Sequence, residues 1–233
     1  MDINAPAKFS RSFFLHELNF PVFQTSIHFE GKDFCSDLWE MYYPVSFKSF
    51  ALKRKSEFVA GRLCAQSAIE RLTSEQQKFL PIGESGAALW PEGIVGSITH
   101  TNNFASAVAG KSSEIESLGI DAENWITKNR MDKIKEFIVS RTELIQINDH
   151  INFSESNIFT LLFSAKESIY KCFSPLLGNS MSFLDVEISF KDISTNQFQY
   201  RFLKNFSPRF PKGFEGVGWS QYDKYRVYTL VSL

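Results

Sequence analysis

The stretch Leu118-Gly119-Ile120-Asp121-Ala122-Glu123 is the starting point for interpreting this chain. Its apolar beginning has the character of a β-strand, and residues two apart in a strand point to the same face, roughly 6.6 Å apart along it. Asp121 and Glu123 are therefore expected to face the same way. Two like charges repel by about 4 kcal/mol at 4 Å and an effective dielectric near 20, so the pair favours a cation between them.

Oxygen-only ligation by two carboxylates suits Mg²⁺, which keeps several waters and takes further ligands from substrate phosphates. A strand that runs into a solvated acidic turn is the alternative interpretation of the same residues.

Composition sets broad limits. A chain of 233 residues with 24 Phe can bury a core as one larger domain or as two small ones. A formal net charge of −1 argues against binding nucleic acid through bulk charge, so any basic site must be local.

Cysteine usage and hydropathy indicate the cellular compartment in which the protein is expected. Cys35, Cys64 and Cys172 are far apart and form no C-x-x-C, so neither a zinc site nor a disulfide framework is indicated, and a reducing cytoplasm fits. Charged residues interrupt the N-terminal segment, and no segment approaches the roughly 20 apolar residues of a membrane span. We expect a soluble protein without a signal peptide.

The first half of the chain predicts a helix and a pair of strands after an irregular opening over residues 1–46. Apolar residues recur at helical spacing over 47–72, and we expect this helix to break before Phe58 because its first part is markedly basic. Residues 94–100 and 104–109 predict two strands joined by an Asn-containing turn, with His100 at the end of the first.

The second half predicts two helices. Residues 125–150 are helical in part, with one apolar side formed by Met131, Ile134 and Ile138, and with Phe137 as a further candidate. Residues 156–173 form the strongest helix in the chain, which Pro175 and Gly178 are expected to end. Its buried face is predicted as Leu162, Ala165, Ile169 and Cys172, and its opposite, polar face as Ser164, Glu167, Ser168 and Lys171.

After Gly178 the pattern is that of β-structure. Apolar residues alternate over 186–190 and 198–202, which predicts a hairpin around 192–196, and two last strands are expected near 214–221 and 225–233. The order of helix and strands therefore occurs twice. It indicates an α+β fold of two similar halves, although no repeat is visible at the level of residues.

Three separated blocks together resemble a known signature. They are residues 90–100 (WPEGIVGSITH), 119–123 (GIDAE) and 163–168 (FSAKES) with Lys171, and they resemble 4′-phosphopantetheinyl transferases. Within that family the chain is most similar to the two-lobed enterobactin synthetase component D group. The block 57–62 (EFVAGR) also resembles that group, and the resemblance runs from about Lys53 to Lys171.

The resemblance implies a fold and an activity. The fold is a monomer of two similar α/β lobes, 1–118 and 119–233, related by a pseudo-twofold axis, with the active site at their junction. The activity is Mg²⁺-dependent transfer of phosphopantetheine from coenzyme A to a serine of an apo carrier protein, with release of adenosine 3′,5′-bisphosphate; Mn²⁺ is an alternative ion. The implied partner is a peptidyl or aryl carrier domain of a siderophore-type synthetase, and a polyketide or fatty-acid acyl carrier stays open.

The resemblance also implies roles for single residues. Glu167 and Lys171 would be catalytic, with Lys171 near the pyrophosphate, and Glu167 would act either as the base itself or through a metal-bound water. The metal would be held by Asp121, Glu123 and Glu167. Coenzyme contacts are expected from Arg54, Arg62, Thr99, His100, Asp121 and Lys171. The sequence does not decide which of Lys53, Arg54 and Lys55 contacts the coenzyme phosphates.

Two other classes of function stay open at this point. One is a module that binds coenzyme A or a carrier protein without chemistry, and the other is a metal-dependent phosphohydrolase that acts on nucleotide pyrophosphates. The intact set of acidic residues favours the transferase.

Overall fold

The computed structural model describes residues 9–11, 22–34, 39, 50–77, 79–83, 86–140, 142–143, 153–178, 180–190 and 196–233. The chain divides into two compact units, Met1–Leu118 and Gly119–Leu233, each with its own sheet and hydrophobic core. The mixed α/β character is confirmed, whereas the assignment of the units as two lobes, the pseudo-twofold axis and the monomeric state stay predictions. Most of the irregular opening, the start of the helix expected from residue 47, most of 139–150, the hairpin turn and Cys35 lie outside the described residues.

The first unit contains a four-stranded sheet in the order β1-β2-β4-β3, with antiparallel neighbours throughout. The two strands predicted from the sequence are confirmed, and they pair across the turn at Asn102-Asn103. The strands are β1 (Phe9–Arg11), β2 (Val22–His28), β3 (Ile94–Thr101) and β4 (Phe104–Lys111).

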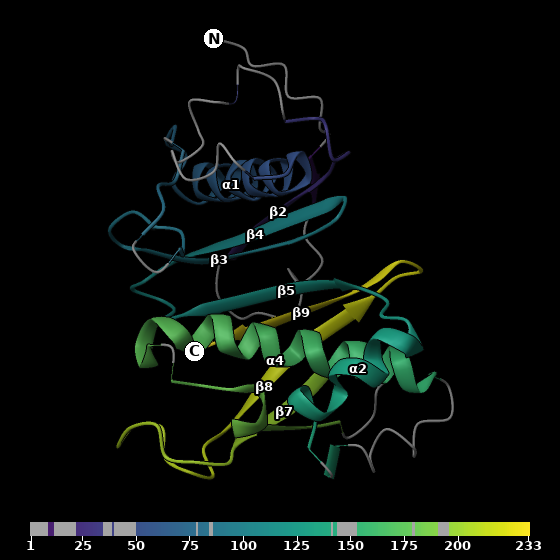
Figure 1. Ribbon diagram of the computed structural model, residues 1–233. Coiled ribbons are helices and arrows are strands. Elements are labelled where there is room, and N and C mark those ends of the chain that lie inside the picture. The colour runs from purple at the N-terminus through teal and green to yellow at the C-terminus, as the bar shows by residue number, and fades with distance from the viewer. Residues whose placement is uncertain are drawn as a thin grey trace. The chain divides into compact units, whose positions relative to one another are not determined.

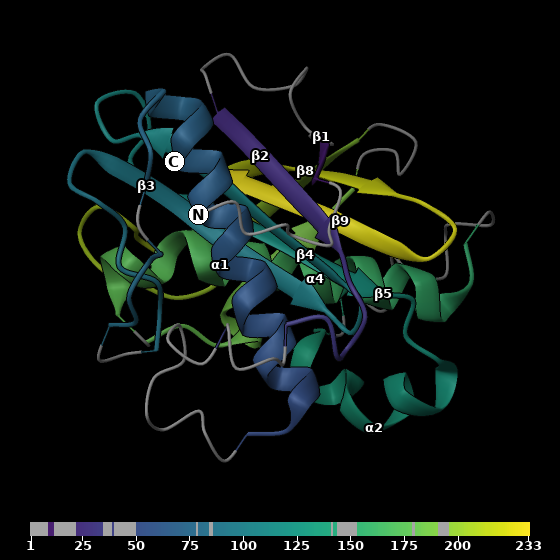
Figure 2. The ribbon, with the colours of Figure 1, turned by 90° about the horizontal axis from the view of Figure 1, so that it is seen from above.

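Helix α1 (Leu52–Thr73) lies over one face of this sheet (Figures 1 and 2). The lack of a side chain at Gly61 allows α1 to lie close to β3, since a Cβ on Gly61 would come within 2.8 Å of the Ile98 side chain. Between Leu52 and Phe58 the predicted break does not occur, because α1 is continuous from Leu52, and Phe50 and Ala51 precede the helix. Lys and Arg are good helix formers, and the basic first turn keeps its charged ends exposed without interrupting the helix.

The second unit contains a five-stranded sheet in the order β5-β9-β8-β7-β6, on which helix α4 (Glu155–Leu177) packs (Figure 1). The alternating apolar residues of the last strands produce this sheet, as predicted, and β6 to β9 pair in antiparallel order. The strands are β5 (Leu118–Asn124), β6 (Val186–Ser189), β7 (Gln197–Phe202), β8 (Glu215–Tyr222) and β9 (Arg226–Ser232). The unit also contains a shorter helix, α2 (Lys128–Ile138), and a 3₁₀ turn, η3 (Phe183–Asp185), and residues 142–143 are helical.

Two details of the helices differ from the predictions. Helix α4 continues through Pro175 to Leu177, because a proline removes only one backbone bond, and Gly178 is the cap with a φ of 64°. Phe137 lies on the exposed side of α2 and is 73% exposed, whereas Met131 and Ile138 are buried as predicted.

The core of the second unit is rich in phenylalanine. The ring of Phe173 on α4 lies 4.9 Å from that of Phe202 and 5.3 Å from that of Phe210, in edge-on contacts. None of the described helices combines the length and the apolar character that crossing a membrane requires.

Gly119 is where β5 comes closest to α4. A Cβ built on this residue would overlap the carbonyl oxygen of Ser168 and lie 2.6 Å from the backbone nitrogen of Cys172. The absence of a side chain at Gly119 therefore lets the strand that carries Asp121 and Glu123 lie directly against the helix that carries Glu167 and Lys171.

We expect Gly119→Ala to lower the free energy of unfolding by roughly 3 kcal/mol, because the added methyl meets backbone that cannot rotate away. Urea denaturation measures the change. Gly31→Ala is the matched control, since nothing lies within 4 Å of its added Cβ. Equal midpoints for the two variants would show that the strand and helix do not meet at Gly119.

Candidate functional site

The carboxylate of Asp121 on β5 joins the strand to α4. Its Oδ1 lies 2.6 Å from Nζ of Lys171, and its Oδ2 accepts a hydrogen bond of 2.7 Å from Oγ of Ser164. The residue is only 3% exposed. Ser164 and Lys171 are seven residues apart on one face of α4, so helical spacing alone presents both side chains to the strand.

Ser164 is itself fixed by Thr229 of β9. The Thr229 hydroxyl donates to the carbonyl oxygen of Ser164 at 2.8 Å, and the two hydroxyl oxygens lie 3.0 Å apart. Because a hydroxyl has one proton, the Ser164 proton points to Asp121 and that of Thr229 to the backbone. The orientation of Asp121 is thus set by buried neighbours.

Two further carboxylates belong to the same electrostatic cluster. Burial raises the pKa of Glu123 to about 7, and the charge of Asp121 adds to the rise. Burial also raises the pKa of Glu167, although Lys171 opposes the rise. Burial alone would lower the pKa of Lys171, but the carboxylates of Asp121, Glu167 and Glu123 raise it above its usual value. The cluster therefore holds excess negative charge around one ammonium group.

A divalent cation fits the chemistry of these donors. Mutual repulsion contributes to the raised pKa values of Glu123 and Glu167, and a cation would remove it. Mg²⁺ needs only one or two protein carboxylates, since waters and substrate phosphates complete its shell. In the described ranges, no three His, Cys, Asp or Glu side chains are arranged to hold a metal ion, so the three-carboxylate site stays a prediction.

The raised pKa of Glu123 gives a pH dependence of stability in the metal-free protein. Between its usual pKa of 4.5 and about 7, Glu123 is more protonated in the folded state than in the unfolded state. The free energy of unfolding should therefore fall as pH rises through this window, with Glu123 contributing roughly 1 to 3 kcal/mol. Urea denaturation at several pH values, with a chelator present, measures the slope.

Two variants isolate this contribution. Glu123→Gln should remove that part of the slope, and Glu215→Gln, whose side chain is 70% exposed, should keep it. Parallel slopes for wild type and Glu123→Gln would contradict the assignment.

A pocket of about 360 Å³ opens beside Glu167. Its walls come from α2, α4 and the segment that leads through η3 into β6, and most of them are apolar or aromatic. The lining residues are Phe137, Lys166, Glu167, Tyr170, Met181, Ser182, Phe183 and Val186. An uncharged, flexible group fits such walls, with a single carboxylate at its side.

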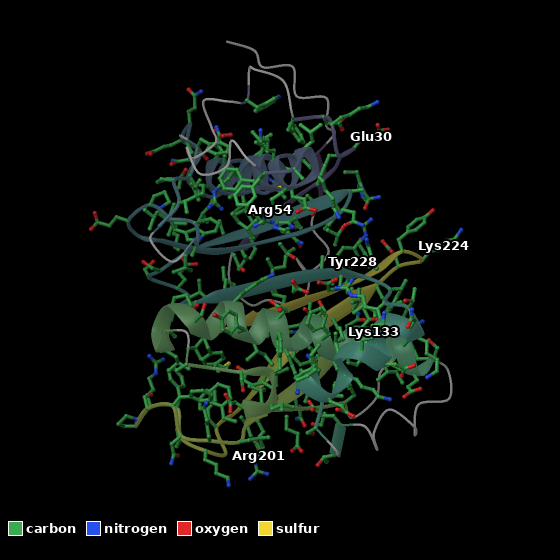
Figure 3. All side chains as sticks on the ribbon, in the orientation of Figure 1. Glu30, Arg54, Lys133, Arg201, Lys224 and Tyr228 are labelled. Atoms are coloured by element: carbon green, nitrogen blue, oxygen red, sulfur yellow. The ribbon has the colours of Figure 1, made fainter. Side chains whose placement is uncertain are left out.

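The first unit has a separate basic cluster at the start of α1, where Figure 3 labels Arg54. Nη1 of Arg54 lies 2.7 Å from Nε2 of His100, and because a guanidinium only donates, Nε2 accepts. The neutral ring then has its proton on Nδ1, which lies 3.7 Å from the carboxylate of Glu57. Glu57 also lies within 4 Å of Arg54 and Lys53, so it holds the basic groups together.

Arg62 is buried on α1, with 6% exposure and its guanidinium 4.9 Å from the ring centre of Phe58. Burial, with a smaller effect of Arg54, lowers its pKa to about 10. Among the described residues its Nε has no hydrogen-bond partner. A buried cation with an unused donor is costly unless an anion meets it, which points to an anionic ligand. Thr99 is buried on β3, and its coenzyme contact stays a prediction.

The sequence alone predicts no role for several of these partners. Ser164 belongs to the predicted face of α4 that carries Glu167 and Lys171, and this alignment is the signal that points to it. Glu57 lies inside the block 57–62, but nothing in the sequence shows that its carboxylate meets Arg54 and His100.

Comparisons with known proteins add independent findings. Residues 46–110 match the family model of the 4′-phosphopantetheinyl transferase N-terminal domain, and residues 117–227 match that of the 4′-phosphopantetheinyl transferase superfamily. The chain is 30% identical over 165 residues to enterobactin synthase component D of Escherichia coli, covering 70% of this chain and 75% of that protein.

Two actinobacterial proteins are also similar. The chain is 32% identical over 141 residues to the 4′-phosphopantetheinyl transferase Npt of Nocardia iowensis, covering 60% of each protein. It is 32% identical over 154 residues to PptT of Mycobacterium tuberculosis, covering 65% of each. The chain thus matches less than two thirds of the length of these two relatives.

Proposed function

The chain belongs to the 4′-phosphopantetheinyl transferase superfamily, and on this premise we propose that it transfers the 4′-phosphopantetheine group of coenzyme A to a serine of an apo carrier protein. The observation that carries the proposal is the buried contact of Asp121 with Lys171 and Ser164, beside Glu123 and Glu167. These residues lie in the segments by which the sequence resembles the family.

In the proposed reaction the serine oxygen attacks the phosphorus next to pantetheine. A new P–O bond forms to the serine, the P–O bond of the diphosphate breaks, and adenosine 3′,5′-bisphosphate leaves with the electron pair. Glu167 accepts the serine proton, since burial makes its carboxylate a stronger base than an exposed one. Lys171 provides positive charge for the diphosphate as charge shifts to the leaving oxygen.

Asp121, Glu123 and Glu167 would hold Mg²⁺ in this proposal. When bound, the ion would neutralise charge on the diphosphate oxygens. Asp121 would keep Lys171 in place at the same time, because it already makes a 2.6 Å ion pair with the ammonium.

The remaining parts of coenzyme A have candidate contacts in each unit. The pocket beside Glu167 suits the uncharged pantetheine arm, because its walls are largely apolar. The cations Arg54 and Arg62, with the His100 ring beside Arg54, suit the phosphates of the nucleotide. The Nε of Arg62, which has no hydrogen-bond partner among the described residues, is the observation that favours this role.

The proposed carrier is a peptidyl or aryl carrier domain of a siderophore-type peptide synthetase. The similarity to enterobactin synthase component D of Escherichia coli supports this choice over a polyketide or fatty-acid carrier. Incubation of the protein with coenzyme A, Mg²⁺ and a panel of apo carriers, followed by intact-mass measurement, tests both the proposed activity and the proposed type of carrier. A gain of one phosphopantetheine on a carrier is expected, and a panel that stays unmodified would overturn the proposed activity.

A further inference from the structure

Lys166, the residue before Glu167, does not share the site of Asp121 and Lys171. Its side chain is 1% exposed and its ammonium group donates three hydrogen bonds, the most that it can make. The acceptors are the carbonyl oxygen of Ile138 at 2.8 Å, Oε2 of Glu143 at 2.8 Å and the carbonyl oxygen of Phe183 at 3.0 Å.

Glu143, the charged partner of Lys166, also accepts hydrogen bonds from two backbone amides. Its side chain is fully buried, and its Oε2 also accepts from the backbone nitrogen of Ser140 at 2.7 Å. Its Oε1 accepts from the backbone nitrogen of Ile188 on β6 at 2.9 Å. The pair therefore connects α4 to the end of α2, to the start of η3 and to β6.

These connected segments are the walls of the pocket beside Glu167. Phe137 precedes Ile138 at the end of α2, Phe183 is itself a lining residue, and Val186 lies on β6 two residues before Ile188. Two segments of the pocket wall, the end of α2 and the start of η3, are thus hydrogen-bonded to the same ammonium group.

We propose that Lys166 and Glu143 are positioning residues that hold the pocket walls against α4 and thereby fix the group bound in the pocket relative to the carboxylate of Glu167. The inference rests on the proposed function for its catalytic consequence and on the geometry alone for the structural one. A buried ion pair is weak evidence for stability, since apolar or neutral replacements often preserve folding. The pair instead connects the end of α2, the start of η3 and β6 to α4, which indicates that it positions the walls of the pocket.

The test uses the full chain with the double variant Lys166→Met/Glu143→Gln, which leaves no unpaired charge in the interior. We expect a folded protein whose kcat per folded molecule falls about 10- to 100-fold, because a displacement of the order of 1 Å has this cost in reaction geometry. KM for the carrier should change less than about three-fold, since the variant does not alter the exposed surface. Unchanged kcat, or an activity loss explained by the unfolded fraction alone, would overturn the inference.

Lys204→Met is the matched control. Lys204 also reaches the η3 segment, through a 2.6 Å ion pair with Asp185, but its side chain is 45% exposed and does not line the pocket. This variant should change kcat less than about three-fold. If Lys204→Met lowers kcat as much as the double variant does, then the loss of any contact to η3 is enough to lower kcat. That result would overturn the specific role of the buried pair.

Hydrogen exchange separates this inference from the proposed function. The amides of Ser140 and Ile188, which donate to Glu143, should exchange at least about ten-fold faster in the double variant than in wild type, whatever the activity. If wild type modifies no carrier but the exchange rises as expected, the proposed function fails and the structural connection stands. Unchanged exchange would overturn the connection. If the double variant does not fold, Lys166→Gln/Glu143→Gln serves for the same measurements, because it also leaves no unpaired charge in the interior.

Discussion

Replacing Asp121 by asparagine is expected to reduce carrier modification at least about 1,000-fold. The amide removes the charge that faces Lys171 at 2.6 Å and places an NH₂ group beside either that ammonium or the Ser164 hydroxyl, both of which need an acceptor. Asp121→Asn thus has two effects. It removes the ion pair that holds Lys171, and it removes one of the carboxylates proposed to bind Mg²⁺ together with Glu123. Intact-mass measurement of an apo carrier over time gives the rate.

The control must separate chemistry from folding. Asp132→Asn on α2 removes a carboxylate that pairs with Lys128 and Lys135 at the surface, and it should keep activity within about two-fold. Circular dichroism should show folded protein for both variants. An Asp121→Asn protein that keeps more than a tenth of wild-type activity would remove Asp121 from the proposed machinery.

Replacing Glu167 by glutamine is expected to lower kcat about 100- to 1,000-fold, the usual contribution of a general base. Wild-type kcat should fall as pH decreases through the pKa of Glu167, because the protonated acid cannot accept the serine proton. Burial raises this pKa in the metal-free protein, whereas a bound Mg²⁺ would oppose the rise. The Glu167→Gln profile should lack this ionisation.

Glu155→Gln is the matched control for Glu167→Gln. It lies in the first turn of the same helix, its side chain is 43% exposed, and it pairs with Lys128 at the surface. Its kcat and pH profile should equal those of wild type. A Glu167→Gln profile that keeps the wild-type ionisation would exclude Glu167 as the base.

The sequence predicted the elements of the site because their signals are local. The apolar run before Asp121 indicated β5, and the 3.6-residue period identified α4 and aligned Ser164 with Glu167 and Lys171. The period does not show which side of a helix is covered. Ser164 belongs to the predicted polar face yet is fully buried, because Asp121, 43 residues away in sequence, provides its acceptor.

Residues whose environment is set by distant contacts were not predictable in this way. Phe137 is exposed beside a pocket, although its helix has a buried apolar side. Arg62 is buried over Phe58, although arginine is mostly found exposed. The pairing of Lys166 with Glu143 joins residues 23 apart, and no periodicity relates a strong helix to the segment that follows α2.

The most direct test of the central claim compares the release of adenosine 3′,5′-bisphosphate from coenzyme A with and without an apo carrier, in the presence of Mg²⁺. We predict release in equal amount to the modified carrier and none above background without it, because the serine hydroxyl is the only nucleophile in the proposed reaction. Release at the same rate without a carrier would contradict the account and assign the cluster around Asp121 to a phosphohydrolase.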